Sequence, residues 1–404
     1  MNARKTDQQH GAQHNRRSSQ QRRAAFTLIE LLMVLAIIGI LISILVPVIA
    51  SAFRKGQEAA EFTEITNLAG ALQKFKDRYG VYPPSQIILR EDGDYYVGGN
   101  PIVAPSPQDT AVFDEALSVQ YLRRIWPQLV IHTRTNLTPY PVTPTEIGDI
   151  SGDGTVNAND FYDWNGDGSL GNPAQVHYLQ GDECLVFFLG GLPTGQVANT
   201  KNPAGCTGFS KAPQWPTQRT GIAPGAGRDG PFHELSSARL VDRDNDGFWE
   251  LVPFRKPSVS GPYAYFSAYD GAGYRPDDLN LTTEPAPNGG TMPTTKFQVL
   301  WPISATYPTA TRRGSGTPAD PYYVESPGPN PYTLGSAYPS TAPPIPAGFI
   351  VRYHKPDGFQ IISPGPAVGY GHGGEFPLDD QLDNRDDNDN LTNFSSGPMQ
   401  DAKL

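Results

Sequence analysis

Cysteine, charge and the usual markers of catalysis are scarce in this sequence. Of its 404 residues, 2 are cysteines and 18% are charged. No pair of histidines has the spacing of a zinc site, no Gly-x-Ser-x-Gly segment marks a nucleophilic serine, and no phosphate-binding loop occurs. The sequence therefore favours a structural protein over an enzyme.

Positive charge is scarce outside the first 25 residues. The whole chain has a net charge of −10, while residues 1–25 contain six basic side chains and one acidic one, so the remainder carries −15. Phosphate binding needs clustered Lys and Arg. The acidic remainder argues against nucleic acid as a partner, and it is compatible with the binding of cations.

Glycine, proline and aromatic residues are plentiful. The 42 Gly and 40 Pro are enriched without reaching the level of a disordered chain, and aromatic residues make up 10%. This composition predicts a loop-rich body that contains β-strands. Cys184 and Cys206 allow two interpretations, a disulfide in an exported domain or two separate buried thiols.

A long uncharged run follows the basic segment. Residues 31–52 hold no charge, and a helix of that length crosses about 30 Å of hydrocarbon. Basic residues before the run and acidic residues after it fit the positive-inside rule, so we expect a cytoplasmic N-terminus. An ordinary secretory signal is the alternative, but it has a shorter apolar run with a small-residue cleavage site after it.

The apolar segment opens with Ala25-Phe26-Thr-Leu-Ile-Glu30-Leu-Leu. This opening resembles the processing and methylation site of type IV prepilins and type II secretion pseudopilins. The resemblance implies that prepilin peptidase cuts between Ala25 and Phe26 and that the new amine is methylated. Glu30 and Pro47 are the fifth and twenty-second residues counted from Phe26, as in the family's pattern. Ala25 departs from that pattern, because the family's residue before the cut is usually Gly.

Glu30 is the most informative residue of this segment. A carboxylate just inside an apolar helix is costly unless it has a partner. The resemblance implies that Glu30 pairs with the N-terminal amine of a neighbouring subunit, so that the pair forms only on assembly. The alternative is a Glu at the headgroup level, near a helix N-terminus where the helix dipole favours negative charge.

Helical periodicity continues over residues 53–80. Apolar residues recur there at steps of three and four, at Phe62, Ile65, Leu68, Leu72, Phe75 and Tyr79. This stripe indicates an amphipathic helix. We expect one helix over residues 26–79, about 80 Å long, loosened or kinked at Pro47 and stopped by Gly80. Its ending, Tyr79-Gly-Val-Tyr-Pro-Pro84, resembles that of major pseudopilins, and a stalk carrying an unrelated domain is the alternative.

The body is expected to complete a pilin-like α+β fold, in which the long helix packs on an antiparallel sheet with long loop-rich insertions. Strand-like runs occur at residues 87–89, 95–97, 184–189, 263–266, 349–353 and 359–362. Residues around 111–131 suggest a short helix. Segments rich in Pro and Gly, near residues 195–231 and 305–347, are expected to be loops.

Three acidic loops of the body have the spacing of calcium ligands. The first resembles the loops of dockerin modules and EF-hands, with oxygen-bearing side chains at Asp149, Ser151, Asp153, Asn157 and Asp160. The second, incomplete loop contains Asp163, Asn165 and Asp167, and the third contains Asp242, Asp244, Asp246 and Glu250. Solvated turns built from Asp, Asn and Gly are the alternative.

The C-terminal segment is a fourth candidate for calcium. Residues 359–394 resemble the C-terminal loop of major pseudopilins, in which backbone carbonyls and aspartates bind a calcium ion. The resemblance implies Asp386, Asp387 and Asp389 as ligands, although Ala367 stands where the family has an Asp. We expect calcium to order the acidic loops of the body.

Together these features predict a structural subunit of a type II secretion pseudopilus or a related pilus-like filament. It has a basic leader (1–25), a transmembrane half-helix (26–52), an amphipathic half-helix (53–80) and a periplasmic or cell-surface body (81–404). The chain would cross the inner membrane once. Its partners would be other pilin or pseudopilin subunits, prepilin peptidase and the inner-membrane assembly platform.

Two alternatives stay open for the function. A minor pilin or surface adhesin would bind glycan or protein through the body, and a body of this size favours a low-copy position in a filament. A membrane-anchored hydrolase is less favoured, because the clustered catalytic groups that it needs are not found in the sequence.

Overall fold

The structure is a computed structural model of the chain, and it describes part of the chain's residues. The described residues are 27–98, 102–103, 112–135, 160–168, 175–196, 203–212, 214–219, 227–243, 246–254, 261–269, 273–274, 278–279, 312–313, 323–324, 331–334, 353–365, 370, 375–376 and 389–399. The chain divides into two compact units, Met1–Phe53 and Arg54–Leu404.

Helix α1 (Leu28–Tyr79) accounts for most of what is described before residue 80. It contains Pro47 and continues through it. In the first unit its large apolar side chains, from Leu28 to Ile49, are all exposed. Among the described residues, α1 is the one helix long and apolar enough to cross a membrane. The prediction of a long N-terminal apolar helix is confirmed.

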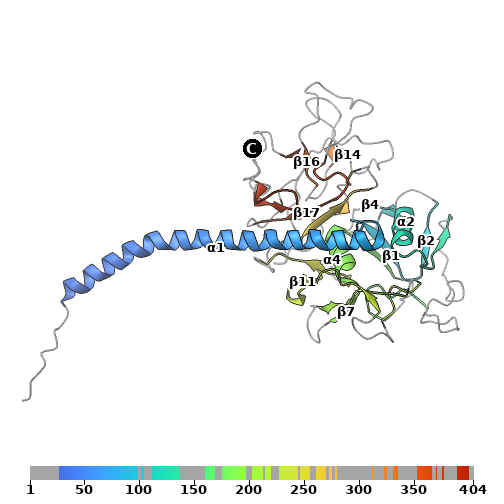
Figure 1. Ribbon diagram of the computed structural model, residues 1–404, viewed down its shortest axis with the longest axis horizontal. Coiled ribbons are helices and arrows are strands. Elements are labelled where there is room, and N and C mark those ends of the chain that lie inside the picture. Colours follow the sequence, from blue (N-terminus) through green and yellow to red (C-terminus); the bar gives the residue numbers. More distant parts are fainter. Residues whose placement is uncertain are drawn as a thin grey trace, which may run out of the picture. The chain divides into compact units, whose positions relative to one another are not determined.

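The second half of α1 buries the stripe that the sequence predicts. Ile65, Leu68, Leu72 and Phe75 are fully buried, and the rings of Phe75 and Phe188 lie 5.6 Å apart in an edge-on arrangement. Figure 1 shows α4 and β17 beside this half of the helix. Burial of this apolar stripe in the core of the second unit stabilises the helix far more than its intrinsic propensity does.

Gly80 ends α1 as predicted. Its φ of 78° lies in the left-handed region that glycine adopts without strain. Its N–H donates to the carbonyl of Lys76 over 2.7 Å, which satisfies one of the last carbonyls of the helix. Pro83 and Pro84 follow, so the chain leaves the helix direction here.

Two further helices belong to the core of the second unit. The predicted short helix is confirmed as α2 (Glu115–Ile125), whose first turn is capped by Asp114. The predicted strand over residues 184–189 is wrong, because this run lies in the helix α4 (Gly181–Gly190). Every residue of α4 is buried, and an apolar run buried on all sides has no periodicity that separates a strand from a helix.

The strands are short and form small sheets of two or three strands. The antiparallel pairs are β1 (Ile87–Arg90) with β6 (Val176–Leu179), β3 (Ile102–Val103) with β4 (Val112–Phe113), β7 (Pro193–Gln196) with β8 (Pro203–Cys206), β9 (Phe209–Ser210) with β10 (Arg228–Asp229), β11 (Leu240–Val241) with β12 (Glu250–Leu251), and β14 (Arg312–Arg313) with β15 (Tyr323–Val324). The parallel pairs are β2 (Asp94–Tyr96) with β5 (His132–Arg134) and β16 (Thr333–Leu334) with β18 (Glu375–Phe376).

One sheet has three strands in antiparallel order, β13 (Ala264–Ser267), β17 (Phe359–Ser363) and β19 (Leu391–Thr392). A 3-10 turn, η1 (Ser237–Arg239), precedes β11. The predicted strands near residues 87, 95, 263 and 359 are confirmed, while residues 349–352 of another lie outside the described residues. The fold class, α+β with a long N-terminal apolar helix, is confirmed.

Two buried carboxylates of α1 interrupt its apolar stripe. Glu64 accepts a short hydrogen bond from the guanidinium of Arg239 and one of 2.9 Å from the Tyr263 hydroxyl. Glu61 accepts one from the hydroxyl of Ser363 in β17. These bonds tie the second half of α1 to segments far along the chain, and periodicity of apolar residues gave no sign of them.

Candidate functional sites

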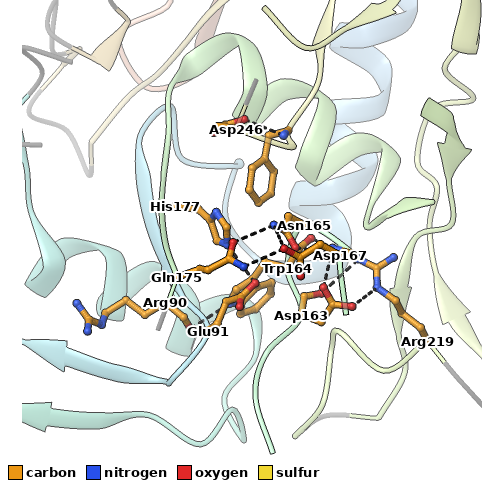
Figure 2. Close-up of polar contacts among 12 residues, drawn as sticks. Arg90, Glu91, Asp163, Trp164, Asn165, Asp167, Gln175, His177, Arg219 and Asp246 are labelled. Atoms are coloured by element: carbon orange, nitrogen blue, oxygen red, sulfur yellow. Dashed lines mark hydrogen bonds and ion pairs between the residues drawn. The ribbon is translucent and has the colours of Figure 1, made fainter. Parts of the chain in front are cut away.

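The structure gathers three carboxylates into one cluster. Glu91, Asp163 and Asp167 each offer an oxygen, and these oxygens all lie within 4.8 Å of one another. No other group of this kind occurs among the residues that the structure describes. Figure 2 shows the three side chains gathered beside Trp164. Asp163 and Asp167 belong to the second predicted calcium loop, whereas Glu91 comes from elsewhere in the sequence.

The backbone around Glu91 explains how the cluster assembles. Glu91 directly follows β1, its N–H donates to the carbonyl of Gln175 over 3.2 Å, and its own carbonyl accepts from the N–H of Tyr162 over 2.8 Å. The indole N–H of the buried Trp164 donates to the carbonyl of Arg90 over 3.2 Å. The end of β1, the acidic loop and the approach to β6 are therefore joined at one point.

The loop from Asp163 to Gly168 has a tight turn of its own. The N–H of Gly166 donates to Oδ1 of Asp163 over 2.7 Å, and that of Asp167 donates to Oδ1 of Asn165 over 3.1 Å. Gly166 and Gly168 have φ angles of 82° and 73°, which explains glycine at both positions. The loop thus holds its side-chain oxygens in a fixed arrangement.

Neighbouring side chains orient the two aspartates of the cluster. The amide of Gln175 donates to Oδ2 of Asp167 over 2.8 Å. The Nε of Arg219 lies 3.1 Å from Oδ2 of Asp163, so one carboxylate of the three has a cationic partner. Figure 2 shows Arg219 approaching Asp163 from the side opposite Glu91.

Glu91 is the fully buried member of the cluster, and it contacts His177. Its Oε1 is 3.1 Å from Nε2 of His177, while its Oε2 has no hydrogen-bond partner among the described residues. Burial raises the pKa of Glu91 to about 9, with the negative charges of Asp167, Asp163 and Asp92 acting in the same direction. Burial also lowers the pKa of His177 to about 4, so its ring is neutral at pH 7.

Sequence reasoning missed Glu91, Gln175, His177 and Arg219. Glu91 carries no local motif, and its place depends on the pairing of β1 with β6, in which Arg90 lies opposite Val176. A contact between segments so far apart in sequence has no signature in either segment alone.

The third predicted calcium loop lies beside the second. A Cβ at Gly247 would come within 3.3 Å of the Cβ of Asn165. Asp246 accepts a hydrogen bond of 2.8 Å from the N–H of Phe248, and the ring of Phe248 lies 5.0 Å from that of His177. The loop is thus held against the acidic cluster by glycine and by aromatic packing.

Two acidic side chains of the third loop, Asp246 and Glu250, accept hydrogen bonds from backbone N–H groups. Oε1 of Glu250, in β12, accepts from the N–H of Arg243 over 3.3 Å. Asp242, Asp246 and Glu250 do not form a three-carboxylate group in the part of the chain that is described. Asp244 lies outside that part, so a metal at this loop stays a prediction.

Several predicted site residues lie outside the described residues: Ala25, Phe26, Asp149, Ser151, Asp153, Asn157, Asp386 and Asp387. Asp160, the last residue of the first loop, is buried. Asp389 is half-buried, and its carbonyl lies against Gly365, where a Cβ would approach it to 1.8 Å. Calcium at the first loop and at the C-terminal segment also stays a prediction.

Cys184 and Cys206 are two free thiols in the structure. Cys184 lies in α4, with its Sγ 3.6 Å from the carbonyl of Leu179, and Cys206 ends β8. Burial raises the pKa of Cys206 to about 12, and burial raises that of Cys184 as well. Both sulfurs are therefore poor nucleophiles.

The start of α1 forms a capping box. Thr27 precedes the first helical residue, and both its N–H and its hydroxyl donate to Oε2 of Glu30 over 3.0 Å. In return, the N–H of Glu30 donates to the Thr27 hydroxyl over 3.3 Å. Such reciprocal bonds satisfy donors that a helix start leaves free. Sequence reasoning missed this role of Thr27, although the pattern Thr-x-x-Glu indicates it.

Residues 20–46 match a family model described as the prokaryotic N-terminal methylation motif. The chain carries a prepilin-type methylation motif. This motif is typical of type IV pilin-like proteins, which are structural, are processed by prepilin peptidase and assemble into filaments. In the prepilin-type segment of this chain, the exposed apolar half of α1 is consistent with a membrane anchor. Neither a curated protein nor a solved structure matches the chain significantly.

Proposed function

We propose that the protein is a structural subunit of a type IV pilin-like filament, and specifically a pseudopilin of a type II secretion system. The observation that carries the proposal is the prepilin-type motif at the start of a helix whose first half is apolar and exposed. Such a surface is stable in lipid before assembly and against the same helix of other subunits after it.

Orientation and processing follow from the same segment. The basic leader would stay in the cytoplasm, α1 would cross the inner membrane once, and the body would lie in the periplasm or at the cell surface. Prepilin peptidase would cut before Phe26, and the assembly platform would then extract the subunit from the membrane. The choice of a pseudopilin over a pilus subunit is supported by the helix end, Tyr79-Gly80, and the two prolines after it.

Glu30 would change partners on assembly. In the isolated chain its Oε2 accepts the two hydrogen bonds from Thr27, while Oε1 takes no part in these bonds. A carboxylate held at the first turn of a helix is available to the cationic amine of a neighbouring subunit. The pair would form only when the neighbour arrives at the correct axial position, so it would set the register of the filament.

Filament assembly in cells tests this proposal. The full chain is expressed with prepilin peptidase and a type II secretion assembly platform, and the fraction recovered in sheared filaments is measured. We expect the wild-type chain to enter the filaments and Glu30→Val to stay in the membrane fraction at a similar total amount. Equal incorporation of both chains would overturn the pairing mechanism, and absence of the wild type from filaments would overturn the proposed function.

A further inference from the structure

We propose that Glu91, Asp163 and Asp167 bind one divalent cation, calcium, at the junction of β1, the acidic loop and β6. Three carboxylate oxygens from two distant segments lie within 4.8 Å of one another. The acidic loop alone supplies two of them, so the site exists only in the folded body. This proposal does not rest on the filament function.

The buried oxygen of Glu91 is the second observation that points to an ion. The side chain of Glu91 is fully buried, and its Oε2 has no hydrogen-bond partner among the described residues. A buried carboxylate oxygen without a donor is unfavourable, because water no longer solvates it. A cation held between Glu91 and the two aspartates supplies the missing partner.

The net charge of the cluster matches a divalent cation. A bound cation would keep all three carboxylates ionised, and Arg219 compensates one of their three negative charges at Asp163. Two negative charges remain for the cation. His177 contacts Oε1 of Glu91 and packs against Phe248, so it orients the carboxylate.

The donor atoms favour calcium over a transition metal. The ligand atoms that face one another are carboxylate oxygens, while the amides of Asn165 and Gln175 donate N–H groups to Asp167 and hold it in place. Hard cations prefer such oxygens, and calcium accepts six to eight of them in flexible geometry. Water would complete the coordination on the side of the exposed Asp167.

Terbium provides a direct probe, because it occupies calcium sites and its luminescence is excited through a nearby tryptophan. Trp164 lies between Asp163 and Asn165 and is fully buried. Terbium is titrated into the full chain in detergent with excitation of tryptophan, and calcium or magnesium is then added as competitor. We expect saturable luminescence that calcium displaces at lower concentration than magnesium does.

Two variants assign the signal to this cluster. Glu91→Gln and Asp167→Asn are expected to weaken terbium binding about tenfold or more, because ligand charge sets the affinity of such sites. Asp167 is exposed, so its replacement leaves folding intact. Glu115→Gln is the matched control, since Glu115 is a buried carboxylate that accepts from the N–H of Tyr96 and lies outside the cluster. Unchanged affinity in both cluster variants would overturn the proposal.

Thermal unfolding gives an independent test, because the order of the unfolding temperatures of Glu91→Gln and the wild type should depend on calcium. In a chelator, Glu91→Gln is expected to unfold at the same temperature as the wild type or higher, because it removes a buried carboxylate from beside two others. With saturating calcium, the wild type is expected to unfold at the higher temperature. A Glu91→Gln chain that is less stable by the same amount with and without calcium would mean that the residue is only structural.

Discussion

The hydroxyl of Thr27 lies 3.0 Å from Oε2 of Glu30 and donates a hydrogen bond to it at the first turn of α1. Glu30 thus has a partner within its own chain before any second subunit arrives. Its contribution to helix capping and its proposed pairing with a neighbouring amine are two separate functions, and they respond differently to substitution.

Glu30→Gln separates these two functions. Glutamine keeps the oxygen that accepts from Thr27, and it is a regular member of capping boxes, but it removes the charge that the amine needs. We expect Glu30→Gln to be as defective in filament incorporation as Glu30→Val, measured in sheared filaments from matched membranes. Normal incorporation of Glu30→Gln would show that capping alone explains the residue.

Gly80 and Gly70 form a matched pair of glycines at and within α1. A Cβ at either position meets no atom within 4 Å, so an alanine changes only the backbone preference. We expect Gly80→Ala to destabilise the body by about 1–2 kcal/mol, since its φ is positive. Gly70→Ala should stabilise it by about 0.5–1 kcal/mol, since Gly70 is helical. Urea unfolding of the full chain in detergent measures both, and a gain in stability in Gly80→Ala would contradict the left-handed helix end.

Glu64 is expected to be the most sensitive acidic residue of α1. It is buried against Arg239 and Tyr263, and Glu64→Gln leaves the guanidinium without a counter-charge. Loss of one partner of a buried ion pair costs about 3–5 kcal/mol. Asp77→Asn is the control on the exposed face and should change the free energy of unfolding by less than about 0.5 kcal/mol. Equal stability of the two variants would show that the Glu64 contact is not formed.

The long helix could be predicted because its signals are local. An uncharged run, apolar residues at steps of three and four, and a glycine before two prolines together fix α1 and its end. Glu61 and Glu64 could not be predicted to be buried, since a charged residue beside an apolar stripe is usually solvated. Their partners, Ser363 and Arg239, come from distant parts of the chain.

Helix α4 and the acidic cluster show two further reasons why prediction from the sequence failed. The run Cys184–Leu189 is apolar throughout, so it has no hydrophobic periodicity that distinguishes a helix from a strand. The Glu183 carboxylate accepts from the N–H of Gln180 over 2.8 Å, and this helix-start signal in the sequence was missed. The spacing of Asp163 and Asp167 did suggest a cation loop. Glu91 joins them only through the pairing of distant strands.

The mass of the mature protein is the most direct test of prepilin-type processing. The full chain is produced in cells with an active prepilin peptidase, purified from the membrane and analysed by intact mass and N-terminal peptide mass spectrometry, with peptidase-deficient cells as the control. We expect a chain that begins at Phe26 with a methylated amine, and an uncut chain in the control. Ala25→Gly, which restores the family's usual residue before the cut, should be processed at least as completely. A purified wild-type chain that still begins at Met1, beside a fully processed pilin in the same cells, would show that the chain is not a prepilin peptidase substrate.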